Sequence, residues 1–371
     1  MLGFVLGAFT GFAAAGWLVP RGGEVAGVAV ANRRAADWQP SPVPKDWEAP
    51  VLARLAGTPT AAPTRPVATV TPVTQVGPTP TRPAGTPAAT SAATSGATSV
   101  AATATRPAST PTAQGAAQAA ARGELHEEHL ESRVLGRRMP FLIWVPPGYT
   151  TGRRYPVVYM LHGGGDGQTP GRAEWLQLGM REALDQAVAA GELPPTIFVF
   201  PEGLDGYWVN HANGGPRWAD YVLQDVVPHV ERIWSVEARP EKRAIGGLSM
   251  GAHGALHLAL NQPETFRVVG AHSPALRTHK ESPPFFGDEA WFARFDPVTL
   301  ASRARVPSGF RAWVDVGERD RFRSETERLV AALERSGART ELKLYPGSHE
   351  GDYWRAHLRD YVRFYGDALR G

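Results

Sequence analysis

A serine between two glycines is the first feature of the sequence that could do chemistry. Gly247-Leu248-Ser249-Met250-Gly251 joins a short apolar run, 243–245, to a helix-like stretch that begins with small residues. In a nucleophile elbow, a serine occupies such a strand-to-helix turn in strained backbone angles and attacks a carbonyl carbon. The pattern also occurs by chance, so a tight turn with an inert serine stays open from this motif alone.

A run of glycines upstream offers the backbone amides that such a reaction needs. Tyr159–Asp166 ends an apolar strand with His-Gly-Gly-Gly, and bare glycine amides can face an anionic oxygen. We predict an oxyanion hole built from the amides of Met250 and Gly164. The alternative is a phosphate-binding loop, but the segment lacks both the Lys-Ser/Thr ending of a P-loop and the G-x-G-x-x-G spacing.

A nucleophilic serine needs a base, and the base needs an acid that orients it. His349 stands in a Pro-Gly-Ser-His loop between the last predicted strand and the C-terminal helix. Asp320 is our first choice for the acid and Glu318 our second, because both follow a predicted strand, whereas Asp315 falls within it and has a structural role. A solvated histidine and a surface carboxylate paired with arginine remain the alternatives at these positions.

Five other histidines are assigned structural roles. His162 is assigned to the glycine-rich turn, and His253 and His257 to packing within the helix after the serine. His126 and His129 form His-Glu-Glu-His, one residue short of a zinc motif, and on a strand they would face opposite sides. No metal site and no cofactor are therefore expected.

These motifs together resemble the esterase D-like putative esterases of the α/β-hydrolase superfamily. The resemblance covers roughly Leu135 to Phe364 through H-G-G-G, G-L-S-M-G-A, V-G-E-R-D-R-F and P-G-S-H followed by Tyr353-Trp354. That family includes feruloyl and acetylxylan esterases, enterochelin esterases, S-formylglutathione hydrolases and mycolyltransferases. The resemblance implies a triad of Ser249, Asp320 and His349 that acts on a small-molecule or polysaccharide-linked ester.

Alternating strand and helix patterns would position these residues. Strands are predicted at 141–145, 156–161, 196–200, 243–245, 268–271, 312–316 and 342–345, and helices at 178–190, 219–233, 250–260, 325–335 and 354–369. The alternation from Pro156 onward predicts an α/β-hydrolase fold, with a mainly parallel central sheet flanked by helices. Catalytic loops are then expected at the carboxyl ends of the strands.

An aromatic segment between two late strands has two interpretations. Pro283–Phe292 contains four aromatic residues and would form a lid or wall of an acyl or aryl pocket, or pack onto its own domain. Trp208 and Trp218, on either side of a loop with glycine and asparagine, carry the same two interpretations.

The N-terminal third has a different composition from the rest. Residues 2–19 are apolar or small apart from Thr10, and we predict a signal peptide or membrane anchor at 1–20 that places the protein outside the cytoplasm. The first cations, Arg21, Arg33 and Arg34, follow this stretch. The positive-inside rule would keep that flank in the cytoplasm, which conflicts with an exported domain. An Ala/Thr/Pro-rich disordered linker is expected at 21–123, because its composition cannot bury enough apolar surface. The esterase domain then spans 124–371.

Charge and cysteine content exclude several classes of function. Residues 1–123 contain 9 Lys and Arg against 4 Asp and Glu, whereas the remainder contains 30 against 32. The slightly acidic globular part is therefore not expected to bind nucleic acid. The absence of cysteine excludes disulfides, a thiol nucleophile and cysteine-ligated metals.

The sequence as a whole predicts a serine carboxylic-ester hydrolase that works through an acyl-enzyme. An acyltransferase would use the same triad and differ only in whether an alcohol outcompetes water. A non-catalytic surface-binding module on the same fold is the alternative from a different class. The sequence leaves the natural ester and the oligomeric state open.

Overall fold

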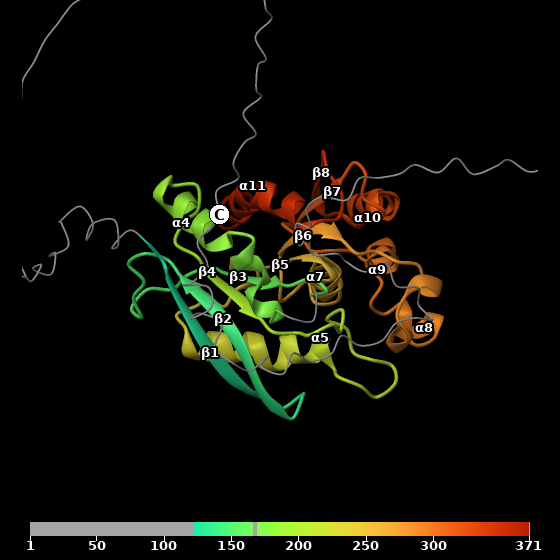
Figure 1. The fold of residues 1–371 in the computed structure, drawn as a ribbon, viewed down its shortest axis with the longest axis horizontal. Helices are drawn as coiled ribbons and strands as arrows, with labels where there is room; N and C mark the ends of the chain where they lie inside the picture. The colour runs from blue at the N-terminus through green and yellow to red at the C-terminus, as the bar shows by residue number, and fades with distance from the viewer. Residues whose placement is uncertain (1–121, 166–168, 371) are drawn as a thin grey trace, which may run out of the picture.

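One mixed sheet organises the molecule (Figure 1). The computed structural model describes residues 122–165 and 169–370. Eight strands form the sheet in these ranges: β1 (Glu124–Ser132), β2 (Arg137–Val145), β3 (Val157–Leu161), β4 (Ile197–Pro201), β5 (Arg243–Ser249), β6 (Val268–Pro274), β7 (Arg311–Gly317) and β8 (Arg339–Tyr345). They are ordered β1-β2-β4-β3-β5-β6-β7-β8. The first two strands run antiparallel to their neighbours, and all later strands pair in parallel.

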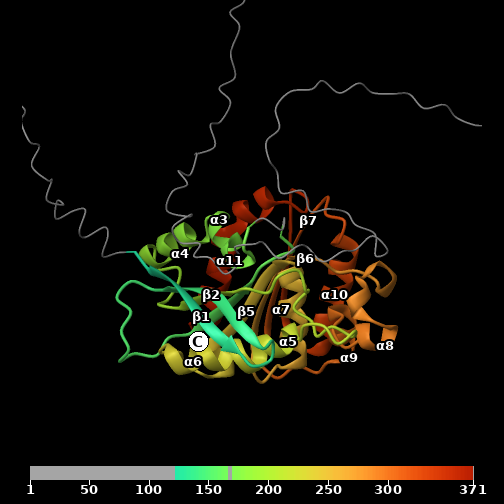
Figure 2. The ribbon, with the colours of Figure 1, turned by 60° about the horizontal axis from the view of Figure 1, so that its bottom comes forward.

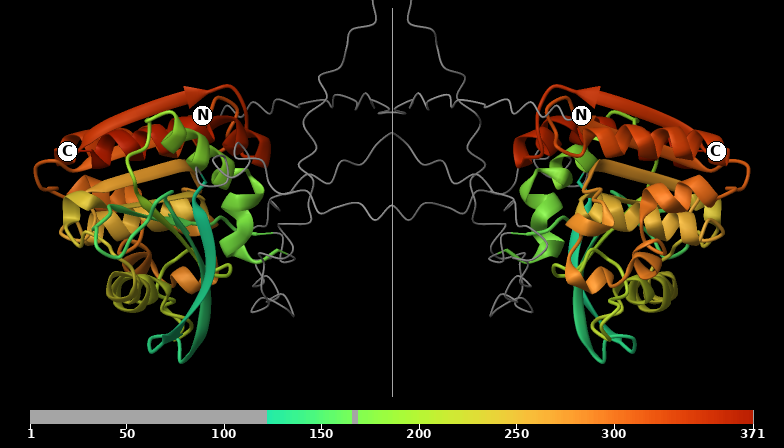
Figure 3. Two further views of the ribbon diagram at one scale, coloured as in Figure 1. Left: turned by 90° about the vertical axis from the view of Figure 1, so that its left-hand side faces the viewer. Right: turned by 90° about the vertical axis from the view of Figure 1, so that its right-hand side faces the viewer.

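Helices cover both faces of this sheet, and Figures 2 and 3 show the resulting layers. One face carries α3 (Glu174–Gln177), α4 (Met180–Ala189) and α11 (Gly351–Leu369). The other carries α5 (Trp218–Asp220), the π-helical η3 (Tyr221–Val226), α6 (Val227–Ile233), α7 (Met250–Asn261), α8 (Glu289–Phe292), α9 (Pro297–Arg303) and α10 (Arg323–Ser336). Short 3-10 turns complete the elements: η2 (Gly171–Ala173), η4 (Pro240–Lys242), η5 (His279–Glu281) and η6 (Pro284–Phe286).

The strand β3 shows how the sequence builds both layers. All five of its residues are buried and apolar. Because successive side chains of a strand point to opposite faces, Val157, Tyr159 and Leu161 pack with α7, whereas Val158 and Met160 pack with α4 and α11. A continuous apolar run of this kind is typical of a parallel strand buried on both sides.

The order of the strands creates the position for a site. β3 pairs with β4 on one side and with β5 on the other, so the chain reverses its direction of winding at β3. Loops that follow two such strands separate and leave a crevice at the carboxyl edge of the sheet. The glycine-rich loop follows β3, and Ser249 ends β5.

Most of the predicted elements and the fold class are confirmed. Each predicted strand lies on an observed one, and the sheet is mainly parallel with helices on both faces. The prediction did not include β1, α3, α8 or α9. β1 is largely polar, with only Leu130 and Ser132 fully buried, so it lacks the apolar alternation that identifies a strand.

The predicted anchor at 1–20 and all but the end of the predicted linker at 21–123 lie outside the described residues. Among the helices within the described ranges, none combines the length and the apolar character needed to cross a bilayer.

Candidate active site

Ser249 occupies a sharp turn between β5 and α7. Its backbone angles, φ 53° and ψ −116°, lie in a region that residues with a side chain rarely adopt. Such strain persists only where the surrounding structure over-determines the conformation. The turn therefore holds the Ser249 side chain at the carboxyl end of a central parallel strand.

The two glycines of the motif are explained by close backbone contacts. A Cβ atom added to Gly247 would lie 2.3 Å from the carbonyl carbon of Gly251. A Cβ added to Gly251 would lie 2.3 Å from the carbonyl oxygen of Leu161 at the end of β3. Any larger residue would push α7 away from β5 and β3. The glycines thus set the position of Ser249 against the loop that follows β3.

The structure brings together the three residues predicted from widely separated motifs. Ser249 Oγ lies 2.7 Å from His349 Nε2, in the loop between β8 and α11. His349 Nδ1 lies 2.9 Å from Asp320 Oδ2, in the loop after β7. In this chain of contacts Nδ1–H donates to the carboxylate, which leaves Nε2 to accept the serine proton.

Asp320, and not Glu318, is the carboxylate in contact with His349. The Glu318 side chain is exposed, whereas Asp320 is buried and its second oxygen accepts a hydrogen bond from the Phe322 amide at 2.8 Å. Burial alone raises the pKa of Asp320. The hydrogen bonds from His349 and Phe322 and the interaction with the imidazole outweigh burial and hold this pKa below its ordinary value. Asp320 is therefore ionised at neutral pH.

Contacts between two loops hold Asp320 and His349 in place. A Cβ on Gly317 would lie 2.6 Å from the carbonyl oxygen of Gly347, whose own φ is +136°. The loops after β7 and β8 can touch only because both residues are glycine. The rings of Phe322 and Trp354 pack edge-on against His349 at centroid distances of 5.1 and 5.0 Å and restrict its orientation.

Ser273 is a fourth polar residue at this site that the sequence reasoning missed. Its hydroxyl donates to Asp320 Oδ2 and lies 3.0 Å from His349 Nδ1. It is the residue before the last one of β6, next to β5, and its φ of 52° is a second strained angle at the same edge of the sheet. The signal that could have identified it is the polar His272-Ser273 pair directly after the apolar residues of β6.

We expect Ser273→Ala to lower kcat by about tenfold with little change in KM, because a hydrogen bond to an ionised group is worth roughly 1.5–3 kcal/mol. The measurement is steady-state hydrolysis of a p-nitrophenyl ester. Ser273→Gly serves as the matched variant, since glycine accepts the positive φ without strain. If Ser273→Gly keeps full activity while Ser273→Ala loses it, backbone strain and not the hydroxyl explains the effect.

The backbone amides of the glycine-rich loop differ in whether they already have a hydrogen-bond partner. The Gly163 amide donates to Glu174 Oε2 at 2.5 Å and is therefore occupied. Gly164, the predicted donor, follows it in the loop and is only partly buried. Met250 is the first residue of α7, so its amide has no hydrogen-bond partner within that helix. The two segments approach each other closely, since a Cβ added to Gly163 would lie 2.6 Å from Leu248 Cδ1 and one added to Gly251 would lie 2.3 Å from the Leu161 carbonyl oxygen.

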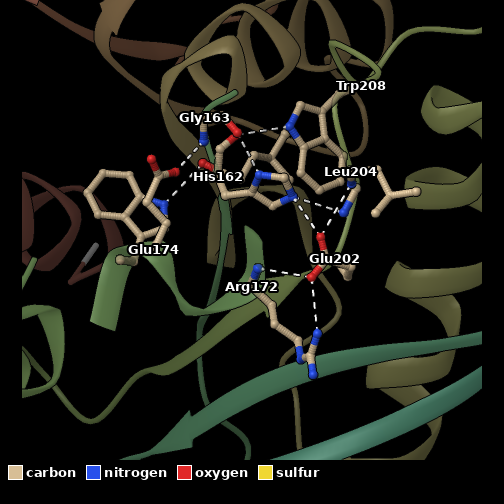
Figure 4. Close-up of polar contacts among 10 residues, drawn as sticks. His162, Gly163, Arg172, Glu174, Glu202, Leu204 and Trp208 are labelled. Carbon is tan, nitrogen blue, oxygen red and sulfur yellow. Dashed lines mark hydrogen bonds and ion pairs between the residues drawn. The ribbon is translucent and has the colours of Figure 1, made fainter. Parts of the chain in front are cut away.

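A buried network of charged and polar side chains contacts both ends of this loop, and Figure 4 shows His162, Arg172, Glu202 and Trp208 within it. The Arg172 guanidinium contacts Glu202 at 3.1 Å and Glu127 at 3.0 Å, and His162 Nε2 lies 3.3 Å from Glu202. The Trp208 indole donates to the carbonyl oxygen of His162 at 3.1 Å. His162 and Arg172 lie at the two ends of the loop, so the network ties both ends to Glu202, the residue directly after β4. His162 belongs to the turn, as its position in the sequence predicted.

Removing the central carboxylate of this network is expected to destabilise the fold. Burial raises the pKa of Glu202, but His162 and Arg172 lower it to about 2, against an ordinary value of 4.5. The contribution to stability is therefore complete above pH 4.5 and is lost as the pH falls toward 2. We expect Glu202→Gln to lower the free energy of unfolding by about 3 kcal/mol at pH 7.

Urea unfolding at several pH values measures this effect, with the exposed Glu241→Gln as the control. The difference between wild type and Glu202→Gln should shrink as the pH is lowered from 5 toward 2.5. A difference that stays constant over this range would contradict the ionic role of Glu202.

Asp315 has the structural role that its position within a strand predicted. It is fully buried, and it accepts hydrogen bonds from the hydroxyls of Tyr353 and Tyr361, both at 2.9 Å. Its other oxygen lies 2.8 Å from Nδ1 of His272, the residue before Ser273. This cluster fixes the end of β6, where Ser273 meets Asp320.

Four other histidines that the sequence singled out lie on α7 and β1. His253 and His257 are buried on α7, and burial lowers the pKa of both, to about 3 for His257, so they pack as neutral rings. His126 and His129 lie on β1, at the opposite edge of the sheet from His349. In the described part of the chain, His, Asp and Glu side chains form no group of three or more that could hold a metal ion.

The aromatic segment packs onto its own domain beside the site. Phe285 stacks on His211 at 4.1 Å, and the ring of Phe286 meets Tyr207 edge-on at 5.6 Å. Tyr207 and Trp208 have φ values of 53° and 58°, so their loop is strained. Trp218 is also buried. The segment and both tryptophans therefore pack within the domain.

Comparison with solved structures establishes the fold. A ferulic acid esterase superposes with a TM-score of 0.59 at 20% identity, covering 67% of this chain and 99% of that one. An S-formylglutathione hydrolase from Agrobacterium tumefaciens gives a TM-score of 0.55 at 21% identity, with coverages of 67% and 96%. At these identities the likeness is one of fold, and both are similar to the described domain over almost their whole length.

Sequence comparison identifies the family. An esterase of Mycobacterium tuberculosis is 33% identical over 148 residues, which are 38% of this chain and only 30% of the relative. S-formylglutathione hydrolase of Arabidopsis thaliana is 25% identical over 268 residues, with coverages of 64% and 91%. The family model described as putative esterase matches residues 132–365, well over half of the chain. The protein therefore belongs to the putative esterase family, as its motifs predicted.

Proposed function

We propose that this protein is a serine carboxylic-ester hydrolase with Ser249 as nucleophile, His349 as general base and Asp320 as the acid that orients the base. The observation that carries the proposal is the line of contacts from Ser249 to His349 at 2.7 Å and from His349 to Asp320 at 2.9 Å. The serine at the start of this line has a strained backbone angle. A serine packed for structure alone would not need an unfavourable φ and a histidine that is itself held by a buried carboxylate.

The reaction would proceed in two halves. Ser249 Oγ attacks the ester carbonyl carbon while His349 Nε2 takes its proton, and the amides of Met250 and Gly164 stabilise the resulting oxyanion. The tetrahedral intermediate then collapses, because His349 returns the proton to the leaving alcohol oxygen. Water attacks the acyl-enzyme by the same route and releases the acid and free Ser249. Asp320 stays ionised throughout and stabilises the imidazolium.

Fluorophosphonate labelling combined with ester hydrolysis tests this function. The purified protein should hydrolyse p-nitrophenyl and hydroxycinnamoyl esters, and peptide mapping should find one labelled residue, Ser249. A non-catalytic binding module would hydrolyse none of these esters and leave Ser249 unlabelled. Adding glycerol as an acceptor separates an acyltransferase, which would form the glycerol ester in preference to the free acid.

We further propose that the enzyme acts outside the cytoplasm. Residues 2–19 would direct it to the membrane or anchor it there, and residues 21–123 would form the linker between the membrane and the esterase domain. This proposal rests on the apolar and Ala/Thr/Pro-rich composition of those segments. Fractionation of cells that express the full chain tests it. Recovery of all the protein in the cytosolic fraction would contradict it.

A further inference from the structure

The last strand of the sheet, β8, has an outer edge that no other described strand covers. Within the described ranges β8 pairs with β7 alone, and it lies at the end of the sheet (Figure 1). Leu342 is 38% exposed and Leu344 is 40% exposed, and they are two of the three large apolar side chains exposed in this part of the chain. An uncovered edge that also exposes apolar side chains is a template for pairing with another strand.

The hydrogen bonds to β7 and its flanking residues show which residues of β8 point outward. The Arg339 amide donates to the Phe310 carbonyl oxygen at 3.0 Å, and the Glu318 amide donates to the Tyr345 carbonyl oxygen at 2.8 Å. The amide and carbonyl of one residue point to the same side of a strand, and this side alternates along the strand. The odd-numbered residues of β8 therefore bond inward. The even-numbered residues direct their N–H and C=O groups to the outer edge, and these are Thr340, Leu342 and Leu344.

The sequence of β8 is complementary to itself in one antiparallel register. If two copies meet about a twofold axis at Leu342, this residue lies opposite itself, and Thr340 lies opposite Leu344 of the second copy. All three residues point outward, so each opposed pair can exchange two N–H···O hydrogen bonds. Glu341 then lies opposite Lys343 of the second copy, and the twofold axis makes this a pair of cross-strand ion pairs.

The charges on β8 distinguish it from the strand at the other end of the sheet. Lys343 Nζ lies 3.7 Å from Glu341 Oε2 in the same copy, and both side chains are exposed by more than a third. A second copy would add the same two charges in reverse order and complete an alternating group of four. By contrast, β1 contains four glutamates and neither Lys nor Arg. Self-pairing of β1 would bring like charges together, which is unfavourable.

We propose that two copies of this protein form a dimer by antiparallel pairing of their β8 strands, with the twofold axis at Leu342. This isologous contact joins the two sheets into one and brings the exposed leucines of both copies together. Because the paired strands are antiparallel, the carboxyl edges of the two sheets face opposite directions. The two candidate active sites therefore lie at opposite ends of the joined sheet and do not face each other.

Disulfide cross-linking of the full chain tests this register, because the chain contains no cysteine and an introduced one is unique. In a hydrogen-bonded antiparallel pair the two Cα atoms are about 5.5 Å apart, within the range that a disulfide spans. We therefore expect Leu342→Cys to form a covalent dimer under a mild oxidant, seen at twice the mass on a non-reducing gel.

Leu344→Cys is the matched control, since it changes an equally exposed leucine of the same strand. In the proposed register Leu344 lies opposite Thr340, so the two introduced cysteines would be about 13 Å apart along the strands. This distance is too long for a disulfide, and Leu344→Cys should give about tenfold less covalent dimer than Leu342→Cys.

Charge variants test the ion pairs between copies, each with Leu342→Cys as the reporter. Glu341→Lys places lysines opposite each other across the axis, and Lys343→Glu does the same with glutamates. Each should lower the yield of covalent dimer by about tenfold. A mixture of the two variants should recover the yield as a heterodimer, recognised by a mass tag on one of them. Lysines then face glutamates between copies, although each copy still carries two like charges.

The changed side chains are all exposed, so thermal unfolding of the variants should stay close to that of wild type. Three results would each overturn the dimer: no covalent dimer of Leu342→Cys, equal yields from Leu342→Cys and Leu344→Cys, or a mixture of charge variants that behaves as its separate components do. Recovery in the mixture alone supports it, because the ion pair within one copy is not restored there.

Discussion

Ser249→Ala is expected to lower kcat for ester hydrolysis by about 10⁴- to 10⁶-fold, the range typical for loss of an activated serine nucleophile. Without Oγ no acyl-enzyme forms, and His349 has no hydroxyl to deprotonate. The oxyanion amides and the binding of substrate remain, so a small residual rate above the uncatalysed reaction is expected. Steady-state assays at substrate concentrations above KM measure the change.

The control for Ser249→Ala is Ser324→Ala, an exposed serine in the first turn of α10. It should hydrolyse the ester at the wild-type rate and accept one equivalent of fluorophosphonate, whereas Ser249→Ala should accept none. Thermal unfolding of both variants should match wild type, because alanine keeps the small side chain that the turn accommodates. Hydrolysis by Ser249→Ala within tenfold of wild type would refute the assignment of the nucleophile.

Asp320→Asn is expected to lower kcat by about 10⁴-fold, the effect seen when the orienting carboxylate of such a triad becomes an amide. The change removes the negative charge that stabilises protonated His349. The asparagine amide can also donate to Nδ1, which moves the imidazole proton to Nε2 and removes the acceptor for the Ser249 proton. Because the pKa of Asp320 lies below its ordinary value, wild type keeps this charge throughout the neutral range.

Glu318→Gln is the matched control, since Glu318 is two residues away in the same loop and was the alternative acid from sequence. Its side chain is exposed, and the measured kcat should stay within twofold of wild type, as for most surface substitutions. The opposite result, a large loss in Glu318→Gln with activity kept in Asp320→Asn, would exchange the two assignments.

The sequence predicts the apolar parts of this fold well because burial leaves a periodic pattern. β3 is apolar at every position, as a strand covered on both faces must be, and it was predicted within one residue. β1 was missed, because its largely charged and polar sequence is similar to that of a loop. The short helices α8 and α9 follow polar caps, Asp288 and Asp296, that a single sequence does not distinguish from turn residues.

Some residues of the candidate site can likewise be recognised from local sequence, and others cannot. Ser249 and His349 belong to motifs whose glycines reflect local backbone geometry, so they can be recognised from neighbouring residues. Ser273 has no such local motif. Its role depends on β6 lying between β5 and β7, which brings its hydroxyl to Asp320 although 47 residues separate them.

The sequence by itself predicted the family, the mainly parallel sheet, and Ser249 and His349 of the proposed triad, because strand ends and glycine turns leave local signals. Only the tertiary structure showed that Asp320, and not Glu318, contacts His349, and that Glu174 occupies the Gly163 amide. Hydrogen bonds and charge interactions act over a few ångströms in space, and the distance between two side chains in different loops depends on how the intervening strands pack.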